Sequence, residues 1–249
     1  MISNLAHDPR TIARNIPGVF EALFPHLAQG VVAGMNRKSS SIQGLQAVPT
    51  AKVDASKLQK AMLFEIAIAA AEQLIDQCEI INWSLCLEIA VERQKEHFDA
   101  KIPQSLSEID KEVSLWVAHN LFAMLEEFQN PVASELIRAP RIPGYQWIAS
   151  GVGDFSIGAT LIEVKCTNRH FSSSDYRQIL MYWLLSYCAA IESGKQQWSM
   201  GILANPRLNI FVKFSFDELI NIAGGGKSKV ELVELFSAIL GNRGQRAID

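Results

Sequence analysis

The sequence has few of the residues on which zinc sites and disulfide frameworks depend. Only four of its 249 residues are cysteines (Cys78, Cys86, Cys166 and Cys188), and no two of them form a CxxC pair. The five histidines are scattered and include no HExxH pair. This spacing gives neither a zinc-ligand pattern nor a disulfide framework. We expect all four cysteines to be buried thiols, and we look for the chemistry in other residue types.

The sequence also has no apolar run of the roughly 18 to 20 residues that a membrane-spanning helix needs. The longest candidate, Ala61 to Ala71, is too short and contains Glu65. The first ten residues, MISNLAHDPR, carry an acid before any apolar run and do not resemble a secretory signal. We therefore expect a cytoplasmic protein without a membrane partner.

The chain as a whole has only a small excess of one sign of charge, but its two parts differ in sign. The formal net charge is -3, and 49% of the residues are hydrophobic, which is enough for a sizeable core. Residues 1–137 hold 11 Lys+Arg and 17 Asp+Glu, whereas residues 138–249 hold 12 and 9. The C-terminal part is thus the better candidate for contact with a polyanion.

The first half of the chain has the apolar spacing of helices. The pattern predicts helices over Ser56 to Cys78, Asn82 to Phe98 and Ser105 to Phe128, because apolar residues recur every three to four positions. No strand pattern interrupts them. We expect a mainly helical N-terminal half.

The pattern changes after the breaker Pro143-Gly144. Trp147 to Phe155 and Thr160 to Thr167 are typical of two strands, joined by a turn over residues 156–159 into a hairpin. A helix follows from Asp175 to Glu192, and then two strands, Trp198 to Ala204 and Ile210 to Ser215. A further helix is expected to begin at Asp217, so the second half is α/β.

Three polar residues share one face of the predicted hairpin. Side chains alternate along a strand, so Glu163 and Lys165 point to the same face, and the plausible registers place Asp154 opposite Glu163 or diagonal to it. Carboxylates are the ligands that Mg²⁺ prefers, usually one or two of them with water and substrate phosphate completing the shell. The hairpin therefore predicts a site for Mg²⁺, or Mn²⁺ in its place, with the Val164 carbonyl as a further oxygen ligand.

Asp154, eight intervening residues and then Glu163-Val164-Lys165 resemble the motif of the PD-(D/E)xK nuclease superfamily. The next helix contains Gln178 and Tyr182, a QxxxY element similar to that of the RecB-like and Cas4-type branch. The resemblance covers roughly residues 130–215. It implies an α/β, restriction-endonuclease-like fold, in which a mixed β-sheet is flanked by helices.

The resemblance also implies roles for individual residues. Asp154 and Glu163 would hold the metal, Lys165 would act on the attacking water and the transition state, and Gln178 and Tyr182 would position the lysine or the DNA backbone. A further acidic ligand is expected on the preceding helix, for which Glu135 is the nearest candidate and Glu126 and Glu127 compete. Four neighbouring arginines are candidates for phosphate contacts: Arg138, Arg141, Arg169 and Arg177.

We therefore expect two regions. Residues 1–130 would be a helical region for docking, oligomerisation or substrate shaping, and residues 131–249 a nuclease core. The expected function is metal-dependent hydrolysis of nucleic acid, DNA in preference to RNA, as in repair, restriction or phage (antiviral) defence, with a helicase or a second copy as a candidate protein partner. The alternative is a non-catalytic nucleic-acid-binding or assembly subunit that keeps the fold.

Overall fold

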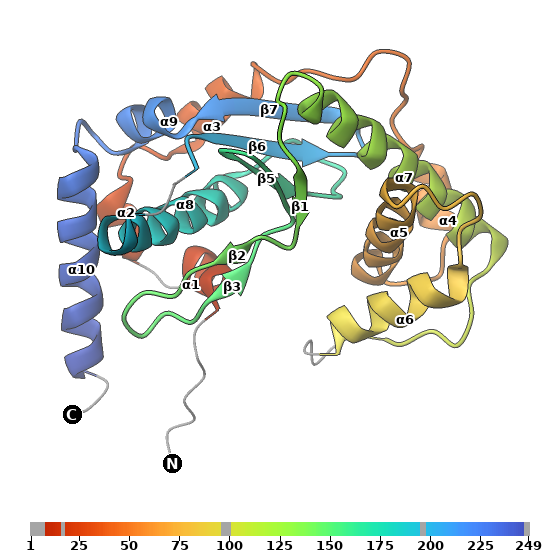
Figure 1. The fold of residues 1–249 in the computed structure, drawn as a ribbon, viewed down its shortest axis with the longest axis horizontal. Coiled ribbons are helices and arrows are strands. Elements are labelled where there is room, and N and C mark those ends of the chain that lie inside the picture. The colour runs from red at the N-terminus through yellow and green to blue at the C-terminus, as the bar shows by residue number, and fades with distance from the viewer. Residues whose placement is uncertain (1–7, 16–17, 96–100, 195–197, 247–249) are drawn as a thin grey trace.

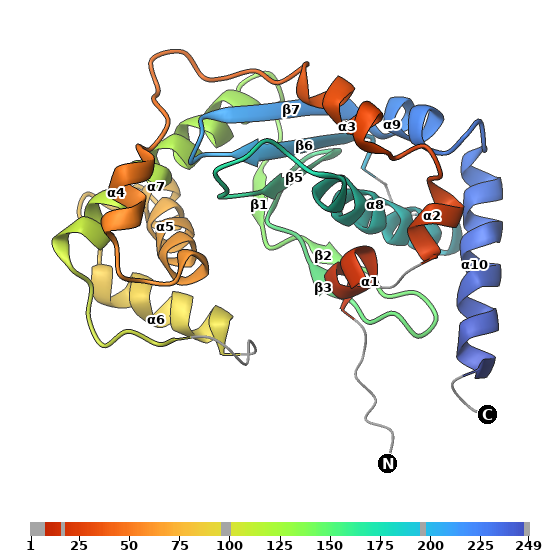
Figure 2. The same ribbon diagram turned by 180° about the vertical axis from the view of Figure 1, so that it is seen from behind.

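The computed structural model describes residues 8–15, 18–95, 101–194 and 198–246. Figures 1 and 2 show a central sheet with helices around it. In chain order the elements are α1 (Pro9–Asn15), α2 (Val19–Leu23), α3 (Gln29–Asn36), α4 (Thr50–Ala55), α5 (Lys60–Ile75), α6 (Trp83–Gln94), α7 (Glu108–Gln129), β1 (Leu136–Arg138), β2 (Arg141–Ile142), β3 (Gly151–Val152), β4 (Phe155–Ile157), β5 (Thr160–Val164), α8 (Ser173–Ser193), β6 (Met200–Asn205), β7 (Ile210–Ser215), α9 (Phe216–Ala223) and α10 (Lys229–Arg246).

The main sheet is mixed, as expected for an α/β protein. Its strand order is β1-β4-β5-β6-β7, and a second small sheet pairs β2 with β3. Strand β4 runs antiparallel to both β1 and β5, β6 runs parallel to β5, and β7 returns antiparallel to β6. Helix α8 connects the parallel pair, because two parallel neighbours need a long crossover.

The hairpin exists, but its first strand and its turn differ from the prediction. The expected strand Trp147 to Phe155 is interrupted, with β3 ending at Val152 and β4 starting at Phe155. Two of the expected turn residues, Ser156 and Ile157, belong to β4 and pair with β5. The turn is shorter because Gly158 adopts a left-handed φ of 52° and reverses the chain within two residues.

Alternating side chains of the sheet divide the core into two layers. One face, with Leu161, Leu203 and Val212, packs against α8 and the helices at both ends of the chain. The opposite face, with Phe155, Ile162 and Ile202, packs against α5 and α7. The alternation therefore decides which side chains of β5 meet α8.

The N-terminal half is helical, as predicted, but residue 130 does not separate two cores. Ile12 of α1, Phe20 of α2 and Val32 of α3 lie in the same buried cluster as α8 and the strands of the sheet. Figure 2 shows α1 lying close to α8, while α4 to α7 form a separate group beside the sheet. The first helices of the chain thus complete the α/β part.

The expectation for the cysteines is wrong at one position. Cys86 and Cys188 are buried and Cys166 is partly buried, but Cys78 is exposed. The reason is that α5 ends at Ile75, and Cys78 lies beyond it in the connection to α6.

Candidate active site

Asp154 and Glu163 lie side by side where the hairpin opens. Phe155 pairs with Ile162, so the same register places Asp154 opposite Glu163, the first of the two predicted arrangements. Oδ2 of Asp154 accepts a hydrogen bond of 2.7 Å from the backbone N–H of Val164. This bond fixes the aspartate although it stands in the break between β3 and β4.

Glu163 is a buried carboxylate, with 1% of its surface exposed. Its Oε1 accepts hydrogen bonds from Lys165 Nζ, at 2.7 Å, and from Gln178 Nε2. Its Oε2 is buried without a hydrogen-bond partner among the described residues. Burial and the charge of Asp154 raise the pKa of Glu163 to about 7, against the opposing charges of Lys165 and Arg10.

Helix α8 supplies the second wall of the site. The helix is capped by Ser172 and Asp175, whose side chains form a capping box. Gln178 and Tyr182, one turn apart, face β5. Gln178 Oε1 accepts a bond of 3.0 Å from Lys165 Nζ, and its Nε2 donates to Tyr182 Oη at 3.0 Å. Four of the five predicted residues, Glu163, Lys165, Gln178 and Tyr182, therefore form one hydrogen-bonded cluster, and Asp154 lies beside it.

Arg10 of α1 reaches the same cluster, and the sequence reasoning missed it. Its Nε donates a hydrogen bond of 2.8 Å to Tyr182 Oη, and its Nη2 lies 3.8 Å from Oδ1 of Asp154. No local motif marks this residue, since 172 positions separate it from Tyr182. A separation of that size leaves no periodic signal in the sequence.

A cavity of about 720 Å³ opens beside Asp154. It is lined by two arginines, Arg10 and Arg93, and by five carboxylates: Asp8, Glu65, Glu72, Glu92 and Asp154. Burial raises the pKa of Glu65, and the charge of Asp154 raises it further, while Arg93 opposes the shift. Glu65 is thus an acidic residue near Asp154, and it lies on α5, a helix that precedes the hairpin. The sequence analysis expected Glu135 to occupy this position.

Glu135 does not join the carboxylate pair, which corrects that expectation. It is exposed and precedes β1, whose Leu136 pairs with Ile157 near the turn of the hairpin. Ala139 donates its N–H to the Asp154 carbonyl at the other end. At about 3.3 Å per strand residue, the four residues from Ala139 to Glu135 span roughly 13 Å along the strand.

The four predicted phosphate-contacting arginines occupy different surroundings. Arg141 is exposed on β2. Each of the other three forms an ion pair: Arg138 with Asp76, Arg177 with Glu21, and Arg169 with Asp175. Those pairings reduce the availability of the three guanidiniums to phosphate.

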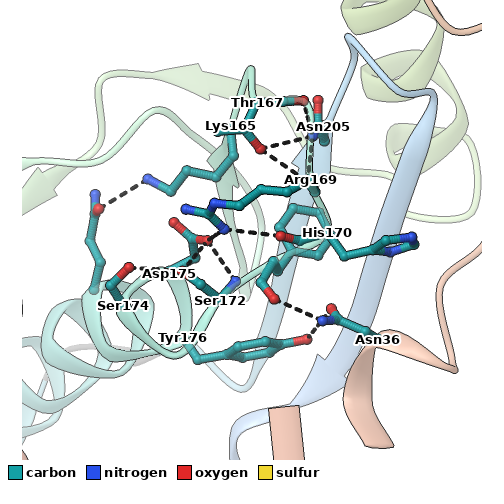
Figure 3. Close-up of polar contacts among 12 residues, drawn as sticks. Asn36, Lys165, Thr167, Arg169, His170, Ser172, Ser174, Asp175, Tyr176 and Asn205 are labelled. Atoms are coloured by element: carbon teal, nitrogen blue, oxygen red, sulfur yellow. Dashed lines mark hydrogen bonds and ion pairs between the residues drawn. The ribbon is translucent and has the colours of Figure 1, made fainter. Parts of the chain in front are cut away.

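Lys165 also borders a polar cluster at the start of α8. Figure 3 shows its side chain extending toward α8 beside Arg169, which bonds Asp175 and the His170 carbonyl. Asn205 at the end of β6 donates to the Thr167 carbonyl at 3.0 Å. These bonds hold the segment between β5 and α8 in a defined conformation.

The donor set fits a hard divalent cation. Among the described residues, no group of three or more His, Cys, Asp or Glu side chains is placed to hold a metal. Two carboxylates with water are nonetheless a usual Mg²⁺ shell, and the unpartnered Oε2 of Glu163 is the kind of atom that a cation would satisfy.

Comparisons of the chain with models of protein families, with curated proteins and with solved structures gave no match. Within the described part of the chain, none of the helices combines the length and the apolar character needed to cross a membrane.

Proposed function

We propose that the protein is a metal-dependent nuclease that hydrolyses phosphodiester bonds, in DNA rather than RNA, with a restriction-endonuclease-like core. One observation carries the proposal. Lys165 donates both to Glu163 and to Gln178, and Asp154, the neighbour of Glu163 across the hairpin, lines a cavity. The mixed sheet with its crossover helix is consistent with that fold.

Asp154 and Glu163 would hold Mg²⁺, or Mn²⁺ in its place. When bound, the cation supplies Lewis-acid polarisation of the phosphoryl oxygen and a water of lowered pKa. Lys165 orients the attacking water and offsets the negative charge that develops on the phosphate in the transition state. Gln178 holds the ammonium of Lys165 in place through its Oε1.

The charges that line the cavity indicate that the cation is required for nucleic-acid binding as well as for cleavage. The five carboxylates outnumber the two arginines, so the lining repels a phosphate backbone. A divalent cation held by Asp154 and Glu163 offsets most of that negative charge and supplies a local attraction for a phosphate. We therefore expect chelation to weaken nucleic-acid binding at this site as well as cleavage.

The test compares Lys165→Ala with wild type on linear, circular, single-stranded and RNA substrates in Mg²⁺ and in Mn²⁺. We expect the variant to lose hydrolysis, mainly in kcat, while it retains folding and metal affinity. Lys213→Ala is the matched control, because Lys213 is an exposed lysine on β7, away from the cavity lining.

Calorimetric titration with Mg²⁺ completes the design. The Asp154→Ala, Glu163→Ala double variant is expected to lose the binding heat. A Lys165→Ala protein that folds normally and cuts at the wild-type rate contradicts the proposal. A wild-type protein that binds nucleic acid but cuts none of the substrates favours the non-catalytic binding or assembly subunit instead.

A further inference from the structure

Arg10 lies at the edge of the site on a helix that packs against the core. Ile12 and Ala13, on the same short helix, are buried against the core that contains α8. The Arg10 N–H donates to Oδ1 of Asp8 at 2.9 Å, which defines the start of α1. The guanidinium therefore extends from a packed helix toward Asp154.

Groups of the protein engage only some of the N–H donors of the Arg10 guanidinium. Of its five N–H donors, Nε–H bonds Tyr182 Oη at 2.8 Å, and Nη2 lies 3.5 Å from the Val152 carbonyl. The contact with Asp154 is long, at 3.8 Å, and 41% of the Arg10 side chain is exposed. Arg10 thus lines the cavity next to Asp154, and among the described residues no hydrogen bond engages its Nη1.

Arg93, the other arginine of the cavity, is engaged differently. Its Nη2 bonds both carboxylate oxygens of Glu72 at 2.8 Å, and its Nη1 lies 3.7 Å from Oε2 of Glu65. Two carboxylates offset this cation, so little of its charge is left for a ligand. Of the two arginines, Arg10 is the one suited to bind an added anion.

We propose that Arg10 binds the substrate phosphate beside Asp154 and Glu163, with its terminal N–H groups on a non-bridging phosphate oxygen, while its Nε–H keeps Tyr182 in position. This inference rests on the proposed nuclease function and deepens it, because it assigns the phosphate contact to the N-terminal helix. A planar guanidinium can serve both partners at once, whereas an ammonium is a single point charge.

The test compares Arg10→Ala and Arg10→Lys with Arg37→Ala, an exposed arginine at the end of α3 that does not line the cavity. Binding of a fluorescein-labelled DNA oligonucleotide is followed by anisotropy in Ca²⁺ at several salt concentrations, and cleavage in Mg²⁺. We expect both Arg10 variants to bind roughly 10- to 100-fold more weakly, as for a lost charged hydrogen bond. The salt dependence of log K should fall by about one in Arg10→Ala alone.

The Mg²⁺ affinity of Arg10→Ala, measured by calorimetry, should equal or exceed that of wild type, because a cation is removed from beside Asp154. Wild-type binding and salt dependence in Arg10→Ala would overturn the inference. A second result would also overturn it: Arg10→Ala binds weakly and has a lowered melting temperature, and Arg10→Lys fully restores both. That result means a structural role only. If wild type binds DNA but does not cut it, the nuclease function fails while the anisotropy comparison still decides the role of Arg10.

Discussion

The ammonium of Lys165 lies between the carboxylate of Glu163, at 2.7 Å, and the amide oxygen of Gln178, at 3.0 Å. The first contact comes from β5, which Lys165 directly follows, and the second from helix α8. Because Gln178 also donates to Glu163 and to Tyr182, its amide has a single useful orientation. The lysine is thus positioned by a residue that itself has little freedom to rotate.

This arrangement predicts a graded loss of activity. Gln178→Ala removes the support of Lys165 but neither the ammonium nor the carboxylates, so we expect kcat to fall by roughly 10- to 100-fold, as for partners that orient functional groups. Lys165→Ala should cost far more. Steady-state kinetics on one substrate, with melting temperatures as the control, decide the point; equal losses in the two variants would mean that Gln178 does more than orient the lysine.

A second prediction concerns pH and the metal-free protein. Burial raises the pKa of Glu163 from 4.5 to about 7, so the folded chain binds this proton more tightly than the unfolded chain does. The resulting stabilisation is complete below pH 4.5 and is lost as the pH rises through 7. Its full size is roughly 3 kcal/mol at 1.36 kcal/mol per pKa unit.

Urea unfolding in EDTA between pH 5 and pH 8 measures this effect. We expect the stability of wild type to fall over that range relative to Glu163→Gln, in which the side chain is neutral throughout. Mg²⁺ should restore stability at pH 8, because the cation replaces the proton as the partner of the carboxylate. Parallel curves for the two proteins would show that Glu163 does not titrate in this range.

The predictable part of the site consists of residues that lie close together in the sequence. Glu163 and Lys165 are two apart on a strand, and Gln178 and Tyr182 are four apart on a helix, so simple periodicity brings each pair to one face. The turn was less predictable, since Gly158 permits a tighter reversal than the four-residue turn that was expected. Only the three-dimensional packing of α1 against the α/β core brings Arg10 to Asp154.

The last prediction tests the packing behind the site at Gly201 of β6. A Cβ at this position would lie 2.6 Å from Cε2 of Phe214 and 3.2 Å from Cζ of Phe216. Both rings are buried and pack edge to face with centroids 5.8 Å apart, so neither can move without disturbing the other. Gly201→Ala should therefore destabilise the protein by about 1–3 kcal/mol through overpacking.

Gly30→Ala is the matched control, because a Cβ there meets nothing within 4 Å and α3 gains a better helix former. It should leave stability unchanged or raise it by up to about 1 kcal/mol. Adding Phe214→Leu to Gly201→Ala relieves the overlap, so the double variant should lose less than the sum of the two single losses in urea unfolding. Additive losses, or a Gly201→Ala protein as stable as wild type, would show that the ring moves aside without cost.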